Sequence, residues 1–106
     1  MECLRQLQSI TGILMSDHLE KACVVSTSHI DYTEAYGLRA LIEQNKLPGA
    51  CNQNTFFIPV NCVESYEEAG FDSLIGTIYF AMKYDAEWLI LDAAGKVHEQ
   101  LPQFNW

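Results

Sequence analysis

Apolar side chains recur at helical spacing in three stretches of the chain, residues 2–15, 31–45 and 72–84. Each stretch gathers its apolar positions on one side of a helical projection, which predicts three amphipathic helices. The faces are formed by Cys3, Leu7, Ile10 and Leu14; by Ala35, Leu38, Leu41 and Ile42; and by Phe71, Leu74, Ile75, Ile78 and Met82.

The second predicted helix has a start signal and a stop signal. Asp31 is a suitable N-cap, and Glu34 stands three residues later, where it can reciprocate in a capping box. Leu47-Pro48-Gly49 ends the helix.

Three short runs are apolar without helical spacing: residues 22–27 (ACVVST), 55–60 (TFFIPV) and 87–92 (EWLILD). Their β-branched and aromatic residues predict strands. Pro59 makes the second run an edge strand or marks its end, because proline cannot donate to a ladder. A turn at 93–95 would fold residues 96–98 back as a hairpin strand.

Helices that alternate with strands predict an α/β sandwich with right-handed crossovers. We expect one domain over residues 1–106, with a mostly parallel central sheet of three strands, or four with the hairpin, flanked by three helices. Residues between the second strand and the third helix read as a loop. Leu101, Phe104 and Trp106 in the tail are too apolar for solvent, so they should pack against the body.

The charge balance is strongly acidic. The chain has 14 acidic and 6 basic residues, a net charge of −8. Residues 51–106 hold eight of the acids and two of the bases, a net charge of −6. Such a field repels nucleic acid and attracts cationic protein surfaces, including those of proteins that bind DNA or RNA. The alternative is that the charge serves solubility alone.

The cysteines and the apolar runs bear on location. Four cysteines occur without a C-x-x-C pair and below the density of a disulfide scaffold, so free thiols in a reducing cytosol are expected. No apolar run approaches the roughly 20 residues of a membrane span, and the N-terminus lacks a signal-peptide pattern. We therefore expect a cytoplasmic protein without a membrane partner.

Both ends of the region 22–106 resemble a small uncharacterised domain family. Trp88 to Asp92 (WLILD), Gly95, Val97, Leu101-Pro102, Phe104 and Trp106 follow its closing signature, W-L-x-L-D-x-x-G-x-V, then L-P, then aromatic-x-W. Val24 to Ile30 (VVSTSHI) is similar to its opening strand and S-T-x-H-[IVL] motif. Its members occur on bacterial plasmids, prophages and other mobile elements, near antirestriction and toxin–antitoxin genes. The resemblance implies a mobile-element accessory protein and transfers no activity.

A polar cluster follows the first predicted strand. Ser26, Ser28 and His29 lie at its carboxyl end, and Asp92 ends the third predicted strand. Parallel strands would bring these side chains to one crevice, where a serine, His29 and Asp92 could act as nucleophile, base and orienter. The alternative is structural: such residues cap helices and turns.

Cofactor and metal sites are not indicated. The spacings of Cys23, Cys51, Cys62, His29 and His98 match no zinc arrangement, and no glycine-rich phosphate loop occurs.

Two aromatic pairs stand on the predicted backs of helices: Tyr32 with Tyr36, and Phe80 with Tyr84. With the acidic Glu43 and Asp85, they are candidate partner-binding residues, because exposed aromatics are common at interfaces. The alternative is that other segments cover them.

The sequence therefore favours a non-enzymatic, acidic protein-binding module over catalysis. Its partner would be a basic, nucleic-acid-handling host protein, which the domain would inhibit or regulate. A small-molecule site or small enzyme at the Ser26, Ser28, His29 and Asp92 crevice is the alternative, and a homodimer through the same aromatics is a third hypothesis.

Overall fold

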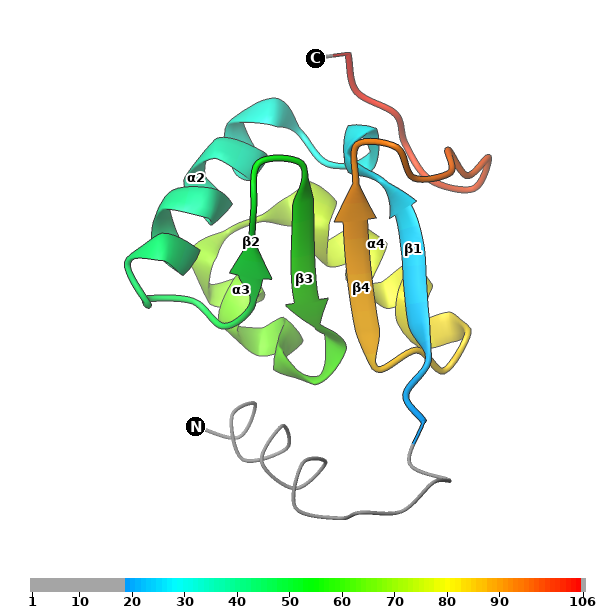
Figure 1. Ribbon diagram of the computed structural model, residues 1–106, viewed down its shortest axis with the longest axis horizontal. Helices are drawn as coiled ribbons and strands as arrows, with labels where there is room; N and C mark the ends of the chain where they lie inside the picture. Colours follow the sequence, from blue (N-terminus) through cyan, green and yellow to red (C-terminus); the bar gives the residue numbers. More distant parts are fainter. Residues whose placement is uncertain (1–18, 106) are drawn as a thin grey trace.

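A four-stranded mixed sheet is the centre of the structure, a computed structural model that describes residues 19–105 (Figure 1). The strands lie in the order β1-β4-β3-β2. Their bounds are β1 Ala22–Ser26, β2 Ala50–Cys51, β3 Thr55–Pro59 and β4 Trp88–Asp92. The three predicted strands are therefore present, and the α/β class is confirmed.

The sheet is less parallel than predicted. β1 and β4 are parallel, whereas β3 is antiparallel to both β4 and β2. The short strand β2 reverses the chain before β3, and two helices connect β3 to β4 in place of one. Two successive helices bring the chain back to the end of the sheet at which β3 finishes. β4 therefore starts beside the end of β3 and runs antiparallel to it. β2 is also the fourth strand: residues 96–98, expected to form it, are not a strand.

Three α-helices occur in the described part of the chain: α2 Tyr32–Glu43, α3 Val63–Ala69 and α4 Asp72–Lys83. α2 and α4 were predicted, and the predicted helix over 2–15 lies outside the described residues. α3 replaces an expected loop. It is seven residues long and anchors one fully buried side chain, Tyr66, whose hydroxyl donates to the Pro48 carbonyl at 2.5 Å.

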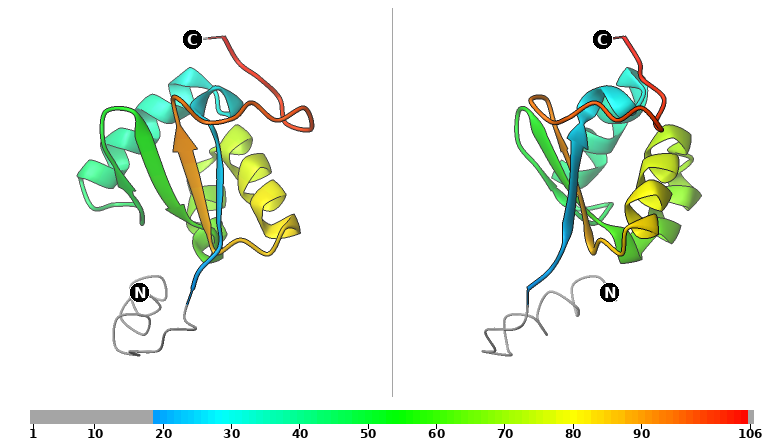
Figure 2. Two further views of the ribbon diagram at one scale, coloured as in Figure 1. Left: turned by 45° about the vertical axis from the view of Figure 1, so that its right-hand side comes forward. Right: turned by 90° about the vertical axis from the view of Figure 1, so that its right-hand side faces the viewer.

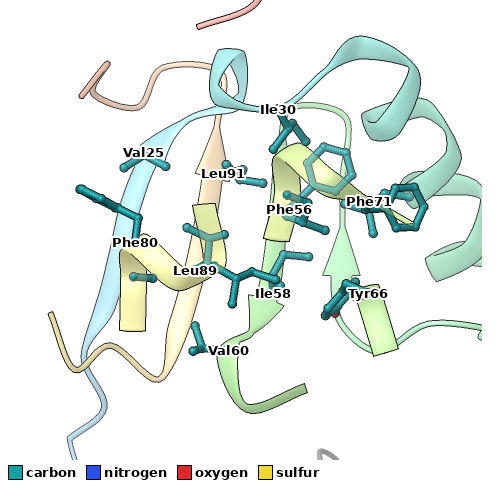
Figure 3. Close-up of a cluster of buried hydrophobic side chains, with 14 of the residues drawn as sticks. Val25, Ile30, Phe56, Ile58, Val60, Tyr66, Phe71, Phe80, Leu89 and Leu91 are labelled. Atoms are coloured by element: carbon teal, nitrogen blue, oxygen red, sulfur yellow. The ribbon is translucent and has the colours of Figure 1, made fainter. Parts of the chain in front are cut away.

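The helices pack on one face of the sheet (Figure 2). Val25, Phe56, Ile58, Leu89 and Leu91 point from the strands into the core between the two layers (Figure 3). No helix of residues 19–105 covers the opposite face, where Val24 and Phe57 are 49% and 36% exposed (Figure 1).

The caps of α2 and α4 are shared between the two helices. Asp31 caps α2 through Thr33, as predicted. Glu34 does not reciprocate; its carboxylate instead accepts from the backbone N–H groups of Ser73 and Leu74 at 3.0 and 3.1 Å. The N-cap of α4 has no side-chain hydrogen bond of its own, and the Asp31 N–H donates to Ser73 Oγ. This exchange ties α2 to α4.

Three further expectations concern the tail, the thiols and the membrane. Leu101 packs against the core and Phe104 is half-buried, whereas Trp106 lies outside the described residues. Free thiols are confirmed for Cys23 and Cys51, but Cys62 is disulfide-bonded. Among the helices of residues 19–105, none has the length and apolar character that crossing a membrane requires.

Candidate functional site

The polar cluster lies where β1 and β4 end side by side. The parallel register pairs Ser26 with Asp92, so the carboxyl ends of these strands do meet. A 3-10 turn, η1 (Thr27–His29), follows β1 directly. The crevice hypothesis requires the ends of β1 and β4 to lie side by side, and they do. The hydrogen bonds of the polar side chains show whether they could act together in catalysis.

Ser26 and Asp92 accept hydrogen bonds from backbone N–H groups two residues further along the chain. Ser26 Oγ accepts from the Ser28 N–H at 3.1 Å and lies 2.9 Å from Ser28 Oγ. Asp92 Oδ1 accepts from the Ala94 N–H at 2.9 Å. These contacts cap η1 and the turn after β4, the structural role that short polar side chains often take.

His29 is fully buried, and both of its ring nitrogens bind backbone. Nδ1 lies 2.7 Å from the Pro102 carbonyl, and Nε2 lies 2.8 Å from the His98 backbone nitrogen. A carbonyl only accepts and an N–H only donates, so the proton resides on Nδ1 and Nε2 is the acceptor. Neither nitrogen is available to a serine or to Asp92. The cluster therefore lacks a nucleophile, base and orienter set.

The C-terminal segment is held over η1 by these contacts, and it crosses the end of β1 in Figure 1. The Phe104 N–H adds a bond to the Ser28 carbonyl at 2.8 Å. The two motif-like ends of the region 22–106 are thus joined by hydrogen bonds between residues 28–29 and residues 98–104. Gly95 lets the backbone after β4 approach β1 closely, since a Cβ there would lie 2.5 Å from the Val25 carbonyl oxygen.

A second candidate site lies where α2 meets the hairpin of β2 and β3. Tyr32 and Tyr36 are 57% and 72% exposed and flank a hollow of about 290 Å³. We call these residues and the hollow the α2 tyrosine surface; the hollow is lined by Tyr32, Ala35, Tyr36, Arg39, Gln53 and Phe56.

Arg39 forms a wall of this hollow. Its guanidinium lies 4.8 Å from the centre of the Phe56 ring and donates to the carbonyls of Asn52 and Gln53. The α2 tyrosine surface is therefore braced by the turn between β2 and β3. Glu43 is exposed at the last turn of the same helix.

Sequence reasoning missed Arg39, although Tyr32, Tyr36 and Arg39 have i, i+4, i+7 spacing and share a helix face. Gln53 and Phe56 carried no such signal, because only the fold brings their hairpin to α2.

Only one member of the second aromatic pair is exposed. Phe80 is 8% exposed, so its expected exposure is wrong; its ring packs against Tyr84 and His98 at centroid distances of 5.2 and 4.6 Å. The C-terminal segment covers it. Tyr84 remains 45% exposed and Asp85 is exposed. They lie near β1, at the opposite edge of the sheet from β2 and α2 (Figures 1 and 2). Five of the six predicted residues are therefore exposed, on two separate surfaces, and Phe80 is buried.

Groups with shifted pKa values are scattered. Burial raises the pKa of the Cys23 thiol and that of the Tyr66 hydroxyl. Hydrogen bonds from Thr33 lower the pKa of Asp31, and the bond to Glu67 raises that of Tyr79. Within residues 19–105, no three His, Cys, Asp or Glu side chains are grouped to hold a metal ion.

Comparisons with known proteins gave one match. No curated protein and no solved structure matches the chain. A model of the C-terminal domain of the family of unknown function DUF5983 matches residues 22–106. This region includes all the described strands and helices and both motif-like ends. The chain therefore belongs to the DUF5983 family, of which it contains the C-terminal domain.

Proposed function

We propose that this domain is a non-enzymatic protein-binding module that contacts its partner through the α2 tyrosine surface. The observation that carries the proposal is the pair of neighbouring tyrosines, 57% and 72% exposed, beside a hollow with aromatic and aliphatic walls. Tyrosine supplies a large contact area at a small cost in side-chain entropy, and it is enriched among the residues that dominate interface energies.

The charge of the chain favours a basic partner. A net charge of −8 attracts a cationic surface and repels phosphate. Arg39 keeps its positive charge in this surface, since its donors bind neutral carbonyls, so the attraction for a basic partner comes from the acidic residues of the rest of the chain. The exposed carboxylate of Glu43 lies on the same helix as the tyrosines.

The class of partner follows from the resemblance of the two motif-like ends to proteins of bacterial plasmids, prophages and other mobile elements. We propose an accessory protein or inhibitor that occupies the phosphate-binding surface of a nucleic-acid-handling host protein. The alternative, a small enzyme or ligand site at Ser26, Ser28, His29 and Asp92, is not favoured. Its base would be a buried histidine with both nitrogens in use.

Affinity capture from a lysate of the organism that encodes the chain tests the proposal. The unaltered protein, Tyr36→Ala and Tyr79→Ala are immobilised, and the captured proteins are quantified by mass spectrometry at low and high salt. Tyr79 is a matched control, because it is 47% exposed but lies on α4.

We expect the unaltered protein to capture a basic nucleic-acid-binding protein. The captured amount should fall tenfold or more with Tyr36→Ala and stay the same with Tyr79→Ala. High salt should release the captured protein. Capture that is unchanged by Tyr36→Ala would contradict the assignment of the surface. Capture that is insensitive to salt would contradict the basic partner. Light scattering on the purified proteins in solution tests the homodimer.

A further inference from the structure

The strand β1 forms one edge of the sheet, and the outward backbone groups of Ala22 and Val24 are unpaired in the described part of the chain. Trp88 N–H donates to the Lys21 carbonyl, whereas Ser26 N–H turns away from β4 and donates to the Lys96 carbonyl at 2.9 Å. Backbone groups alternate in direction along a strand, so those of Ala22 and Val24 also point away from β4. Within residues 19–105, no hydrogen bond occupies these groups.

A hollow of about 270 Å³ runs beside this edge. One wall is the strand itself, residues 21–25, and the other is formed by Phe80, Tyr84, Ala86 and His98. Figure 3 shows Phe80 beside β1 at this end of the sheet, on the same side as Val25. The open edge thus has an apolar recess on its helix side.

We propose that β1 and this recess form a docking groove for an extended, basic segment of another protein, which adds to the sheet as a fifth strand. Its backbone would pair with Ala22 and Val24, and one of its apolar side chains would enter the recess between Phe80, Tyr84 and His98. Strand addition of this kind takes affinity from main-chain bonds and specificity from alternate side-chain pockets.

The backbone, the length and the charge of the groove favour an extended, basic segment as its occupant. Unpaired edge groups are complementary to another extended backbone. The Lys96 carbonyl already occupies the Ser26 N–H, so the groove ends there and takes only a short segment. A second copy would bring another net charge of −8 to the same edge, whereas a basic segment is attracted. Lys21 keeps its positive charge, since its Nζ donates to the neutral Tyr84 carbonyl at 3.0 Å, so the attraction comes from the net charge of the whole chain.

This groove lies at the opposite edge of the sheet from the α2 tyrosine surface, and the inference does not depend on the proposed function. A segment docked here would leave Tyr36 untouched. Binding at the two sites can therefore be distinguished.

The test uses the hexapeptide Ac-KVRVKV-NH2 and two versions N-methylated at alternate residues, offset by one. N-methylation removes donors along one edge of the peptide and keeps its charge and side chains. We expect the unmodified peptide to bind and to slow amide exchange at Ala22 and Val24. One methylated version should bind at least tenfold more weakly than the other, because only one edge of the peptide faces β1.

Variants complete the test. Val24→Pro removes the outward donor and should weaken binding by tenfold or more, whereas Val24→Ala and Tyr36→Ala should retain it. If Val24→Pro does not fold, amide exchange in the unaltered protein decides. Equal binding of both methylated versions, protection at other residues or no binding at millimolar peptide would overturn the proposal. Protection of Val24 by self-association without peptide would also overturn it, since a second copy would then be the occupant.

Discussion

Substitution of His29 by alanine separates a structural histidine from a catalytic one. The side chain is fully buried and joins η1 to the C-terminal segment through the Pro102 carbonyl and the His98 N–H. His29→Ala removes both bonds and leaves a cavity. Each hydrogen bond contributes about 0.5–1.5 kcal/mol, and the cavity adds a further cost.

We expect His29→Ala to lower the free energy of unfolding by about 2–4 kcal/mol. At roughly 4 °C per kcal/mol for a domain of this size, the melting temperature falls by about 8–16 °C. Thermal unfolding followed by circular dichroism measures the shift. The C-terminal segment should also become more sensitive to protease, because its two ties to η1 are lost.

His29→Gln is the matched control, since its amide oxygen can accept from the His98 N–H in place of Nε2. It should recover part of the loss. A melting temperature that is unchanged in His29→Ala would refute the reasoning, because it would mean that neither bond fastens the C-terminal segment.

Three further predictions concern stability. Glu34→Ala leaves two N–H groups at the start of α4 without their carboxylate and should cost about 2 kcal/mol in chemical unfolding, with a smaller loss for Glu34→Gln. Gly95→Ala forces a Cβ against the Val25 carbonyl and should cost about 1–3 kcal/mol in the same assay; an unchanged midpoint would contradict this close approach. The lowered pKa of Asp31 stabilises the fold above the ordinary carboxyl pKa of 3.8, and this contribution is lost as pH falls through the folded value. Asp31→Asn should therefore make the melting temperature fall less steeply as the pH is lowered through the acid range. Thermal unfolding at a series of pH values measures this dependence.

Helical periodicity and dense apolar runs predicted the large elements. The apolar faces of α2 and α4 and the dense runs of β1, β3 and β4 each fall on the observed element. β2 and α3 were missed because two and seven residues are too few to display a period. Both reverse the chain, so their omission also explains why the sheet was expected to be mostly parallel.

The exposure of the candidate site residues could be predicted from sequence only where helix spacing alone determines it. Tyr32 and Tyr36 stand one turn apart on α2, and both remain exposed as their spacing predicted. Phe80 has the same i, i+4 pattern with Tyr84, yet His98 of the C-terminal segment buries it. The partners of His29 come from more than 65 residues away, and no local pattern could reveal them.

Photo-cross-linking from position 36 is the most direct measurement of whether this domain acts by binding through the α2 tyrosine surface. A benzophenone amino acid replaces Tyr36 in one sample and Tyr79 in another, and both are irradiated in a lysate of the encoding organism. The account predicts a cross-link to a basic nucleic-acid-handling protein from position 36 and none from position 79. Cross-links from position 79 alone, or from neither position, would contradict it.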